Sequence, residues 1–391
     1  MVVTIVVLLI LAGISLNLVL GQNGIISRAQ DARNQTVEGQ VNTEKAVNAL
    51  TDEMEDLISE NENSGNGGNS GGSQTTVENV VIPEGYYYVG GTKAKGIVIS
   101  DNVADKELDK GKEDVRRDLA GNQWIWVPVE TPSSLYTTVD AGQALAGDTG
   151  VKTTKYTNTI ISGITRGLPG STNWREPDIL THSNYGDNED RAKTAGFSSL
   201  ANMAETMVSE YEEMIASIEK YKGFYIGRYE LTANGEKTGA TQDNVDWYTL
   251  YKNCTTLAVG SKVKTRMIWG LQWDATCKWL DSSGFDITNS SAWGNYDNNT
   301  ATGHGTKQNT GYSESWKANN IYDFAGNCWE ITQEAYGTYN RALRGGNYLI
   351  YGTYNPASTR DSTLPTGTGA ISGSRPTLYL IPWDMEAMNS K

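Results

Sequence analysis

The first twenty residues of the chain are predominantly apolar and carry no charged side chain: MVVTIVVLLILAGISLNLVL. A helix rises ~1.5 Å per residue, so a run of this length reaches ~30 Å, the thickness of a bilayer's hydrocarbon core. The pattern predicts a helix at residues 1–20 that crosses a membrane once. A secretory signal peptide is the alternative, but no basic region precedes the run and no small-residue cleavage site follows at the usual distance.

A weaker apolar stripe follows between residues 25 and 58, where helix-forming residues predominate. Its apolar side chains recur at steps of three and four residues and are Val47, Leu50, Met54 and Leu57. This spacing predicts an amphipathic stalk helix. The stripe could pack against copies of itself or against a partner helix, and a solvated stalk is the alternative.

Residues 59–76 read SENENSGNGGNSGGSQTT, which contains no large apolar side chain and is rich in Gly, Ser and Asn. Such a segment cannot form a packed element and is typical of a flexible linker. Beyond it, residues 77–391 alternate short β-like runs with Gly, Asn and Asp turns. We expect one α+β domain with short strands, few helices and an insertion at about 130–220.

Two helices stand out in this domain. Apolar residues from Leu200 to Tyr221 keep to one face while glutamates occupy the other, which predicts a helix at 198–221. A second helix is expected at about 273–280. The runs GYYYVGG and NQWIWVPV are typical of strands.

The charge and the cysteine count exclude several functions. The formal net charge is -14 and the pI is about 4.7, whereas nucleic-acid binding needs clustered Lys and Arg. Three cysteines without a CxxC pair, and two separated histidines, make a zinc site improbable. We expect buried free thiols at Cys254, Cys277 and Cys328, although one disulfide would suit an exported protein.

The segment LILAGISLNLVLGQNGIISRAQDAR resembles the N-terminal helix of type IV pilins, over roughly residues 1–58. The resemblance implies a protein of the cell membrane, with its C-terminal domain outside the cell and possible self-assembly through the helix. That family also uses a basic leader ending in Gly and a Glu near the mature start. Neither occurs in this sequence. Either the chain begins at an internal methionine of a longer reading frame, or it is a degenerate relative, and both readings weaken the expectation of filament assembly.

The domain resembles the formylglycine-generating (sulfatase-modifying) family, whose fold is related to the C-type lectin fold. Four stretches occur in the family's order, at 122–129, 223–232, 269–280 and 320–348. The last, NIYDFAGNCWEITQEAYGTYNRALRGGNY, is the most specific. The family's usual Leu-Pro-Thr-Glu-Ala segment after the helix at 273–280 is missing.

The same resemblance argues against catalysis. Catalytic members carry two copper-binding cysteines after the Arg-Gly-Gly turn, which is Arg344–Gly346 here, and the matching positions hold Ile350 and Asn355. An aliphatic side chain cannot bind copper, and an amide replaces a thiolate poorly. We therefore expect no copper and no enzyme activity.

The motif NIYDFAGNCWE offers four oxygen-bearing side chains of the kind that calcium prefers: Asn320, Asp323, Asn327 and Glu330. Catalytic relatives hold structural calcium near this motif, so the resemblance implies the same cofactor. The alternative is a tight turn in which these side chains cap backbone groups.

The stretch 347–374 contains no Lys or Glu and is dense in Tyr, Asn, Ser, Thr and Gly, as binding loops are. It also resembles the variable face of lectin-like proteins that retroelements diversify, the alternative being an ordinary irregular loop. The expected surface contacts are Asn347, Tyr348, Tyr351, Thr353, Tyr354, Asn355, Ser358 and Asp361. Arg344 is expected in a structural ion pair, and Arg375 in one with Asp323 or Glu330.

Together these patterns favour a membrane-anchored, surface-displayed protein that binds an extracellular protein or glycan, as an adhesin or receptor-binding protein would. A minor pilin or pseudopilin with a structural role is the first alternative. An oxidase of the formylglycine-generating type is the second, and the absent thiols count against it.

Overall fold

The fold is given by a computed structural model. It describes residues 75–129, 159–160, 165–166, 174–337 and 339–382. These residues belong to one unit, Ser73–Lys391. The predicted membrane helix, the stalk and nearly all of the linker lie outside them, as does most of the first half of the predicted insertion. No helix within the described residues is both long and apolar enough to cross a membrane.

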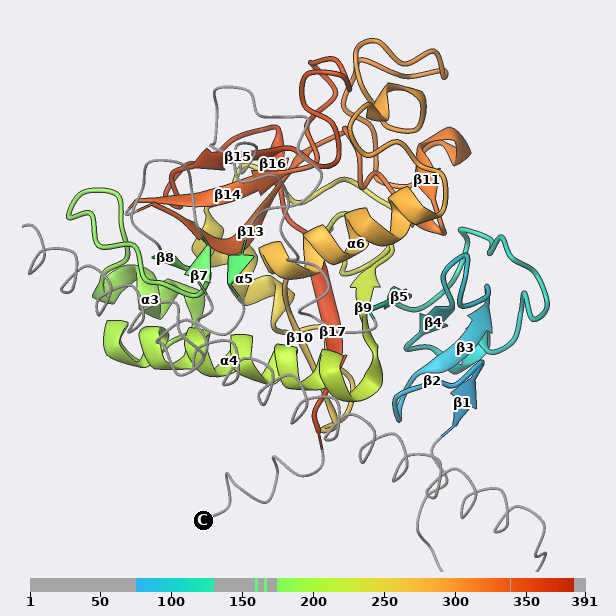
Figure 1. Cartoon of the computed structure of the whole chain (residues 1–391), viewed down its shortest axis with the longest axis horizontal. Coiled ribbons are helices and arrows are strands. Elements are labelled where there is room, and N and C mark those ends of the chain that lie inside the picture. Colours follow the sequence, from blue (N-terminus) through green and yellow to red (C-terminus); the bar gives the residue numbers. More distant parts are fainter. Residues whose placement is uncertain (1–74, 130–158, 161–164, 167–173, 338, 383–391) are drawn as a thin grey trace, which may run out of the picture. The chain divides into compact units, whose positions relative to one another are not determined.

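The largest sheet has six strands in the order β10-β17-β9-β5-β4-β3, and every neighbouring pair is antiparallel (Figure 1). Its strands are β3 (Tyr87–Gly90), β4 (Val98–Ser100), β5 (Gln123–Pro128), β9 (Gly223–Gly227), β10 (Val263–Met267) and β17 (Pro376–Leu380). Successive side chains of a strand point to opposite faces. Strand β5 therefore places Trp124 and Trp126 in one hydrophobic cluster, and Ile125 and Val127 in another.

The α-helices of the described residues are α3 (Glu189–Ala195), α4 (Leu200–Tyr221), α5 (Trp247–Cys254) and α6 (Gly270–Ser282). Helix α4 begins after Ser199, whose side chain accepts the N–H of Asn202, and ends at Lys222 in the left-handed conformation. The apolar part of its buried face is Met203, Met207, Tyr211, Met214 and Ile218. The helices predicted at 198–221 and 273–280 are confirmed, and α6 is longer than expected at both ends.

A second sheet of four strands has the order β15-β14-β13-β16. Its strands are β13 (Trp329–Tyr336), β14 (Asn340–Arg344), β15 (Arg360–Thr363) and β16 (Ser372–Gly373). The smaller strands are β1 (Thr76–Val77), β2 (Val80–Val81), β6 (Thr159–Ile160), β7 (Thr165–Arg166), β8 (Trp174–Arg175), β11 (Lys317–Ala318) and β12 (Ile321–Tyr322). Short 3₁₀ helices are η1 (Val103–Asp105), η4 (Ser290–Ala292) and η5 (Glu314–Trp316). The described residues thus combine many short strands with few helices, as the sequence predicts.

Candidate functional site

The predicted binding segment begins with the connection between β14 and β15, two neighbouring antiparallel strands. At its base, Arg344 and Arg360 are partners in the strand register. Both guanidinium groups bind Asp274 of α6, at 2.7 Å and 3.0 Å, and all three side chains are buried. Arg360 also pairs with Glu334 of β13 at 2.9 Å. The expected structural ion pair of Arg344 is confirmed, and it fixes the base of the loop.

The loop leaves β14 through a glycine turn. Gly345 and Gly346 have φ angles of 86° and 78°, a region that glycine adopts at little cost. A Cβ atom on Gly346 would lie 2.2 Å from the carbonyl oxygen of Asn355, so a larger residue would push the two arms of the loop apart. The hydroxyl of Tyr296 donates to the carbonyl of Gly345 at 2.6 Å. The two arms of the loop are therefore in close contact at the turn, and the hydrogen bond from Tyr296 holds the turn in place.

A second segment, residues 287–299, supports the loop through hydrogen bonds. The N–H of Gly352 donates to the side-chain oxygen of Asn298 at 3.0 Å, and the carbonyl of Gly352 accepts the N–H of Ser290 at 3.0 Å. The N–H of Asp297 donates to the carbonyl of Ile350 at 3.1 Å. This supporting segment was not predicted from the sequence, although its Asn-rich run is visible there.

The structure divides the eight expected contact residues into three groups by their exposure. Tyr351, Thr353 and Tyr354 are exposed, and Tyr348 and Asp361 are half-buried. The remaining three, Asn347, Asn355 and Ser358, are buried, which corrects their expected surface position. They build the loop instead: the side-chain oxygen of Asn347 accepts the N–H of Leu349 at 2.8 Å, and the N–H of Ser358 donates to the carbonyl of Ile287.

Two tyrosines dominate the exposed part of the loop. The rings of Tyr351 and Tyr354 are parallel within 3°, with centroids 5.6 Å apart, and they are 44% and 61% exposed. Leu349 beside them in the sequence is 56% exposed. Residues 347–358 contain no ionisable group other than tyrosine. The loop therefore offers an uncharged, aromatic and aliphatic surface with neutral hydrogen-bonding groups, which suits a partner that also lacks strong charge.

The positions of the missing thiols are compatible with packing. Ile350 is partly buried against the hydrophobic core, and Asn355 is buried. All three cysteines of the chain are buried and free, as expected. Burial raises the pKa of Cys254, Cys277 and Cys328 above the ordinary thiol value. Buried thiols that resist ionisation are poor nucleophiles and poor metal ligands.

The four side chains expected to hold calcium bind different protein groups. Asn320 donates to the carbonyls of Lys95, Gly96 and Glu113, which lie far away in the sequence. Asn327 donates to Glu230 at 2.6 Å. Among the described residues no group of three or more His, Cys, Asp or Glu side chains is placed to hold a metal ion. These residues do not form one ready-made set of calcium ligands, and calcium stays a prediction.

Arg375 and Glu330 form a fully buried ion pair at 2.6 Å, which confirms one of the two partners expected for Arg375. Asp323 is also buried, and burial raises its pKa to about 6. Its Oδ2 accepts hydrogen bonds from the Thr310 hydroxyl at 3.0 Å and the Gly311 N–H at 2.7 Å. Its Oδ1 has no partner within the described residues. Titration of Asp323 is therefore coupled to the stability of the core.

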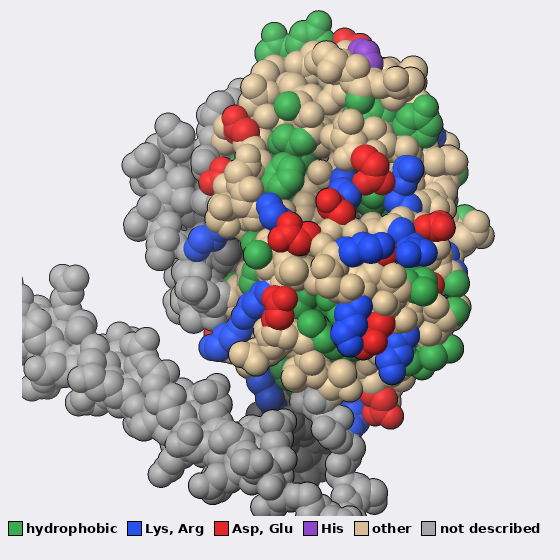
Figure 2. Space-filling view, turned by 90° about the vertical axis from the view of Figure 1, so that its right-hand side faces the viewer, with side chains coloured by type: hydrophobic (Ala, Val, Ile, Leu, Met, Phe, Trp, Pro, Cys, Tyr) green, Lys and Arg blue, Asp and Glu red, His purple; other side chains and the backbone are tan. Residues whose placement is uncertain are grey.

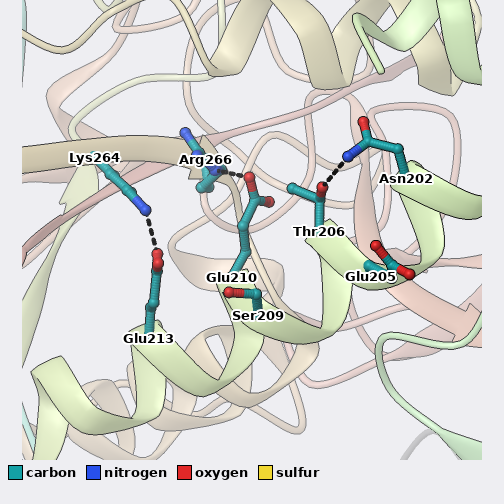
Figure 3. Close-up of a pocket in the computed structure, with 8 residues that line it drawn as sticks. All are labelled: Asn202, Glu205, Thr206, Ser209, Glu210, Glu213, Lys264 and Arg266. Atoms are coloured by element: carbon teal, nitrogen blue, oxygen red, sulfur yellow. Dashed lines mark hydrogen bonds and ion pairs between the residues drawn. The ribbon is translucent and has the colours of Figure 1, made fainter. Parts of the chain in front are cut away.

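A polar cleft of about 310 Å³ lies between α4 and β10. In Figure 3, Glu213 points toward Lys264, and Glu210 points toward Arg266, which it pairs with at 2.6 Å. The hydroxyl of Tyr251 donates to Glu210 at 2.8 Å, yet burial still raises the pKa of this carboxyl group. Because each of the two cations of the cleft is paired with a carboxylate, we interpret the cleft as a set of ion pairs that joins α4 to the edge strand.

Charged groups on one face of the domain also occur in mixed pairs. Figure 2 shows Lys, Arg, Asp and Glu side chains intermingled across the middle and lower part, whereas uncharged side chains fill most of the upper part. Pairs of this mixed kind also include a buried carboxylate, because Asp109 accepts from both Lys112 at 2.6 Å and Arg116 at 3.0 Å. This face lacks the continuous basic surface that nucleic-acid backbones require.

Similarity to known proteins does not identify a family for this chain. No protein-family model matches the sequence, and no curated protein matches it. Among solved structures, Treponema denticola variable protein 1 is similar over 41% of this chain and 85% of its own, with 16% sequence identity and a TM-score of 0.31. A TM-score this low establishes neither a shared fold nor a shared function.

Proposed function

We propose that this chain is a surface-displayed ligand-binding protein and not an enzyme. In this proposal, residues 1–20 anchor the chain in the cell membrane, residues 25–58 form a stalk, and residues 59–76 are a linker. The domain at 77–391 lies outside the cell. It presents the loop between β14 and β15 to an extracellular protein or glycan.

The observation that carries this proposal is the pair of exposed tyrosines on a loop that is held by ion pairs and hydrogen bonds. Tyr351 and Tyr354 offer large contact area with only two side-chain torsions each, so their ordering on binding costs little entropy. The loop beneath them is already ordered by Asp274 at its base and by Asn298 at its side. A preformed aromatic surface loses less freedom when it binds.

The finer fold, a C-type lectin-like domain of the formylglycine-generating type, belongs to the same proposal. It is supported by the order of the four family-like stretches, which contain in turn β5, β9, most of α6, and the strands β12, β13 and β14. The proposal also includes diversification of the loop. Exposed Tyr351, Thr353 and Tyr354 could vary freely, because the ion pairs and most hydrogen bonds that hold the loop involve other residues.

Two alternative functions have less support. A minor pilin or pseudopilin rests on residues 1–58, which lie outside the described residues, and a basic leader with a Gly cleavage site upstream in the reading frame would favour it. An oxidase requires two accessible thiols near the glycine turn. The loop contains none, and the three cysteines of the chain are buried.

A binding screen tests the proposal. Fluorescently labelled full-length chain in mild detergent is applied to a glycan array and to intact bacterial and animal cells, beside the Tyr351→Ala/Tyr354→Ala variant. We expect at least one surface to retain the wild type and to lose the variant. A screen in which nothing binds, or in which both proteins bind equally, contradicts the proposal.

The proposed structural calcium has its own test. Asp323 is the member of the expected set whose Oδ1 lacks a partner within the described residues, so it would be the first to gain from a cation. Bound calcium stabilises the folded chain by mass action, and its removal with EGTA then lowers the melting temperature. An unchanged melting temperature would exclude calcium as a structural cofactor.

A further inference from the structure

Three aromatic side chains from two distant segments meet at the surface, away from the loop between β14 and β15. The His182 ring stacks on Tyr185 with centroids 5.1 Å apart. It also makes a T-shaped contact with Tyr339, with centroids 5.5 Å apart and an angle of 63° between the rings. Tyr185 and Tyr339 remain 43% and 45% exposed. In Figure 1 the segment that leads into α3 and the joined ends of β13 and β14 lie on the same side of the domain. We call these three residues the aromatic platform.

The segment that carries His182 and Tyr185 is held firmly. Asp187 forms a buried ion pair with Arg341 of β14 at 3.0 Å, and its other oxygen accepts the Tyr248 hydroxyl at 2.7 Å. The N–H of Gly186 donates to the carbonyl of His182 at 2.7 Å, and a Cβ on Gly186 would lie 2.3 Å from the Leu180 carbonyl oxygen. These contacts fix the platform before any ligand arrives, which lowers the entropy cost of binding.

Three polar groups of the platform have no hydrogen-bond partner within the described residues. Nδ1 of His182 accepts the N–H of Asn184 at 3.3 Å, so a neutral ring carries its hydrogen on Nε2. Within the described residues, neither Nε2 of His182 nor the hydroxyls of Tyr185 and Tyr339 have a hydrogen-bond partner. The platform therefore combines exposed ring faces with three unused polar groups.

None of the three platform side chains is a carboxylate, a guanidinium or an ammonium group. In the same segment, the carboxylate of Asp187 is paired with Arg341, and the guanidinium of Arg191 donates to the carbonyls of Gly186 and Asn184. The platform itself therefore offers an opposite charge to neither a cationic nor an anionic ligand. Charge complementarity thus favours an uncharged ligand that has one apolar face and a hydroxyl-bearing edge.

From this geometry we infer a second binding site, which takes a pyranose ring of a neutral saccharide. The C–H face of the sugar packs on the exposed ring of Tyr185 or Tyr339, where the negative face of the π system meets weakly positive hydrogens. The sugar hydroxyls exchange hydrogen bonds with the two phenols and with the imidazole. This site is separate from the proposed loop site, and either one can be removed without the other.

Saturation-transfer NMR on the full-length chain tests the inference. The probes are maltohexaose, cellohexaose and chitohexaose, each at about 5 mM or less. We expect at least one of them to receive saturation. In the Tyr185→Ala/Tyr339→Ala variant we expect an affinity for that saccharide that is weaker by a factor of about ten or more. The exposed Tyr312→Ala control and the Tyr351→Ala/Tyr354→Ala variant should bind it with the wild-type affinity.

Two further measurements separate a loss of binding from a loss of folding, and a saccharide from other ligands of aromatic surfaces. Should the alanine variant unfold, Tyr185→Leu/Tyr339→Leu keeps apolar bulk while removing both rings, and the same loss is expected. Tetramethylammonium and a proline-rich peptide serve as alternative ligands of aromatic surfaces. The inference fails when no saccharide binds, when the platform variants bind like wild type, or when only an alternative ligand depends on Tyr185 and Tyr339.

Discussion

Arg344 and Arg360 face each other across β14 and β15 and share the single carboxylate of Asp274. The two arginines stand at the two ends of the loop, so one side chain of α6 binds both ends. The loop can therefore carry exposed tyrosines without depending on them for its own order. This relationship makes the base of the loop the first place to test.

Replacing Asp274 with Asn removes the charge that the two buried guanidinium groups share, and within the described residues only Arg360 keeps a carboxylate partner, Glu334. Breaking a buried ion pair typically costs about 3–5 kcal/mol, and we expect a loss of this size in the free energy of unfolding, measured by urea denaturation. The control is Glu107→Gln, which breaks an exposed pair with Lys110 and should cost less than about 1 kcal/mol. Similar small losses in both variants would contradict this role for Asp274.

Replacing Asn298 with Ala removes the acceptor for the N–H of Gly352. A hydrogen bond of this kind contributes about 1 kcal/mol, so the Gly352 amide should exchange with solvent about fivefold faster. Hydrogen-exchange NMR measures this directly. Asn298→Asp keeps a side-chain oxygen and should retain most of the protection; an alanine variant as well protected as wild type would count against the support by residues 287–299.

Asp323 gives a prediction about pH. Its folded pKa of about 6 lies above the ordinary value near 4, so the folded chain binds the proton more tightly than the unfolded chain. The stability that this group contributes is complete below about pH 4 and is lost as the pH rises through about 6. We expect Asp323→Asn, relative to wild type, to be more stable at about pH 7.5 than at about pH 4.5.

Urea denaturation at the two pH values measures this difference, with the exposed Asp118→Asn variant as the control. In the Asp323→Asn variant the new amide oxygen can still accept from Thr310 and Gly311, so the substitution keeps the hydrogen bonds of Oδ2. A stability difference between variant and wild type that is the same at both pH values would contradict the raised pKa.

The local patterns of the sequence were enough to predict several elements. The stripe of α4 has the helical period, and the residues of β5 alternate between two hydrophobic clusters. The sequence also predicted that Arg375 pairs with Asp323 or Glu330. A buried guanidinium needs a carboxylate partner, and these were the two candidate carboxylates in the family-like motif. A strong hydrophobic period, and a buried charge that requires a partner of opposite charge, can therefore both be predicted from the sequence.

The missed features depend on contacts between distant residues. A loop rich in Asn and Ser reads as exposed, but the turn at Gly346 folds Asn355 against it, and Ser358 bonds to Ile287. Burial of these residues follows from the path of the backbone and not from their polarity. For the same reason, no pattern in the sequence indicates that His182 meets Tyr339.

The central claim is that Tyr351 and Tyr354 bind the ligand and do not stabilise the fold. The most direct measurement is the Kd of wild type and of Tyr351→Ala/Tyr354→Ala for a surface ligand found by the binding screen, together with the melting temperature of each protein. We predict at least about a hundredfold weaker binding and a melting temperature within about 2 °C of wild type. Equal affinities, or a large fall in melting temperature, would contradict the account.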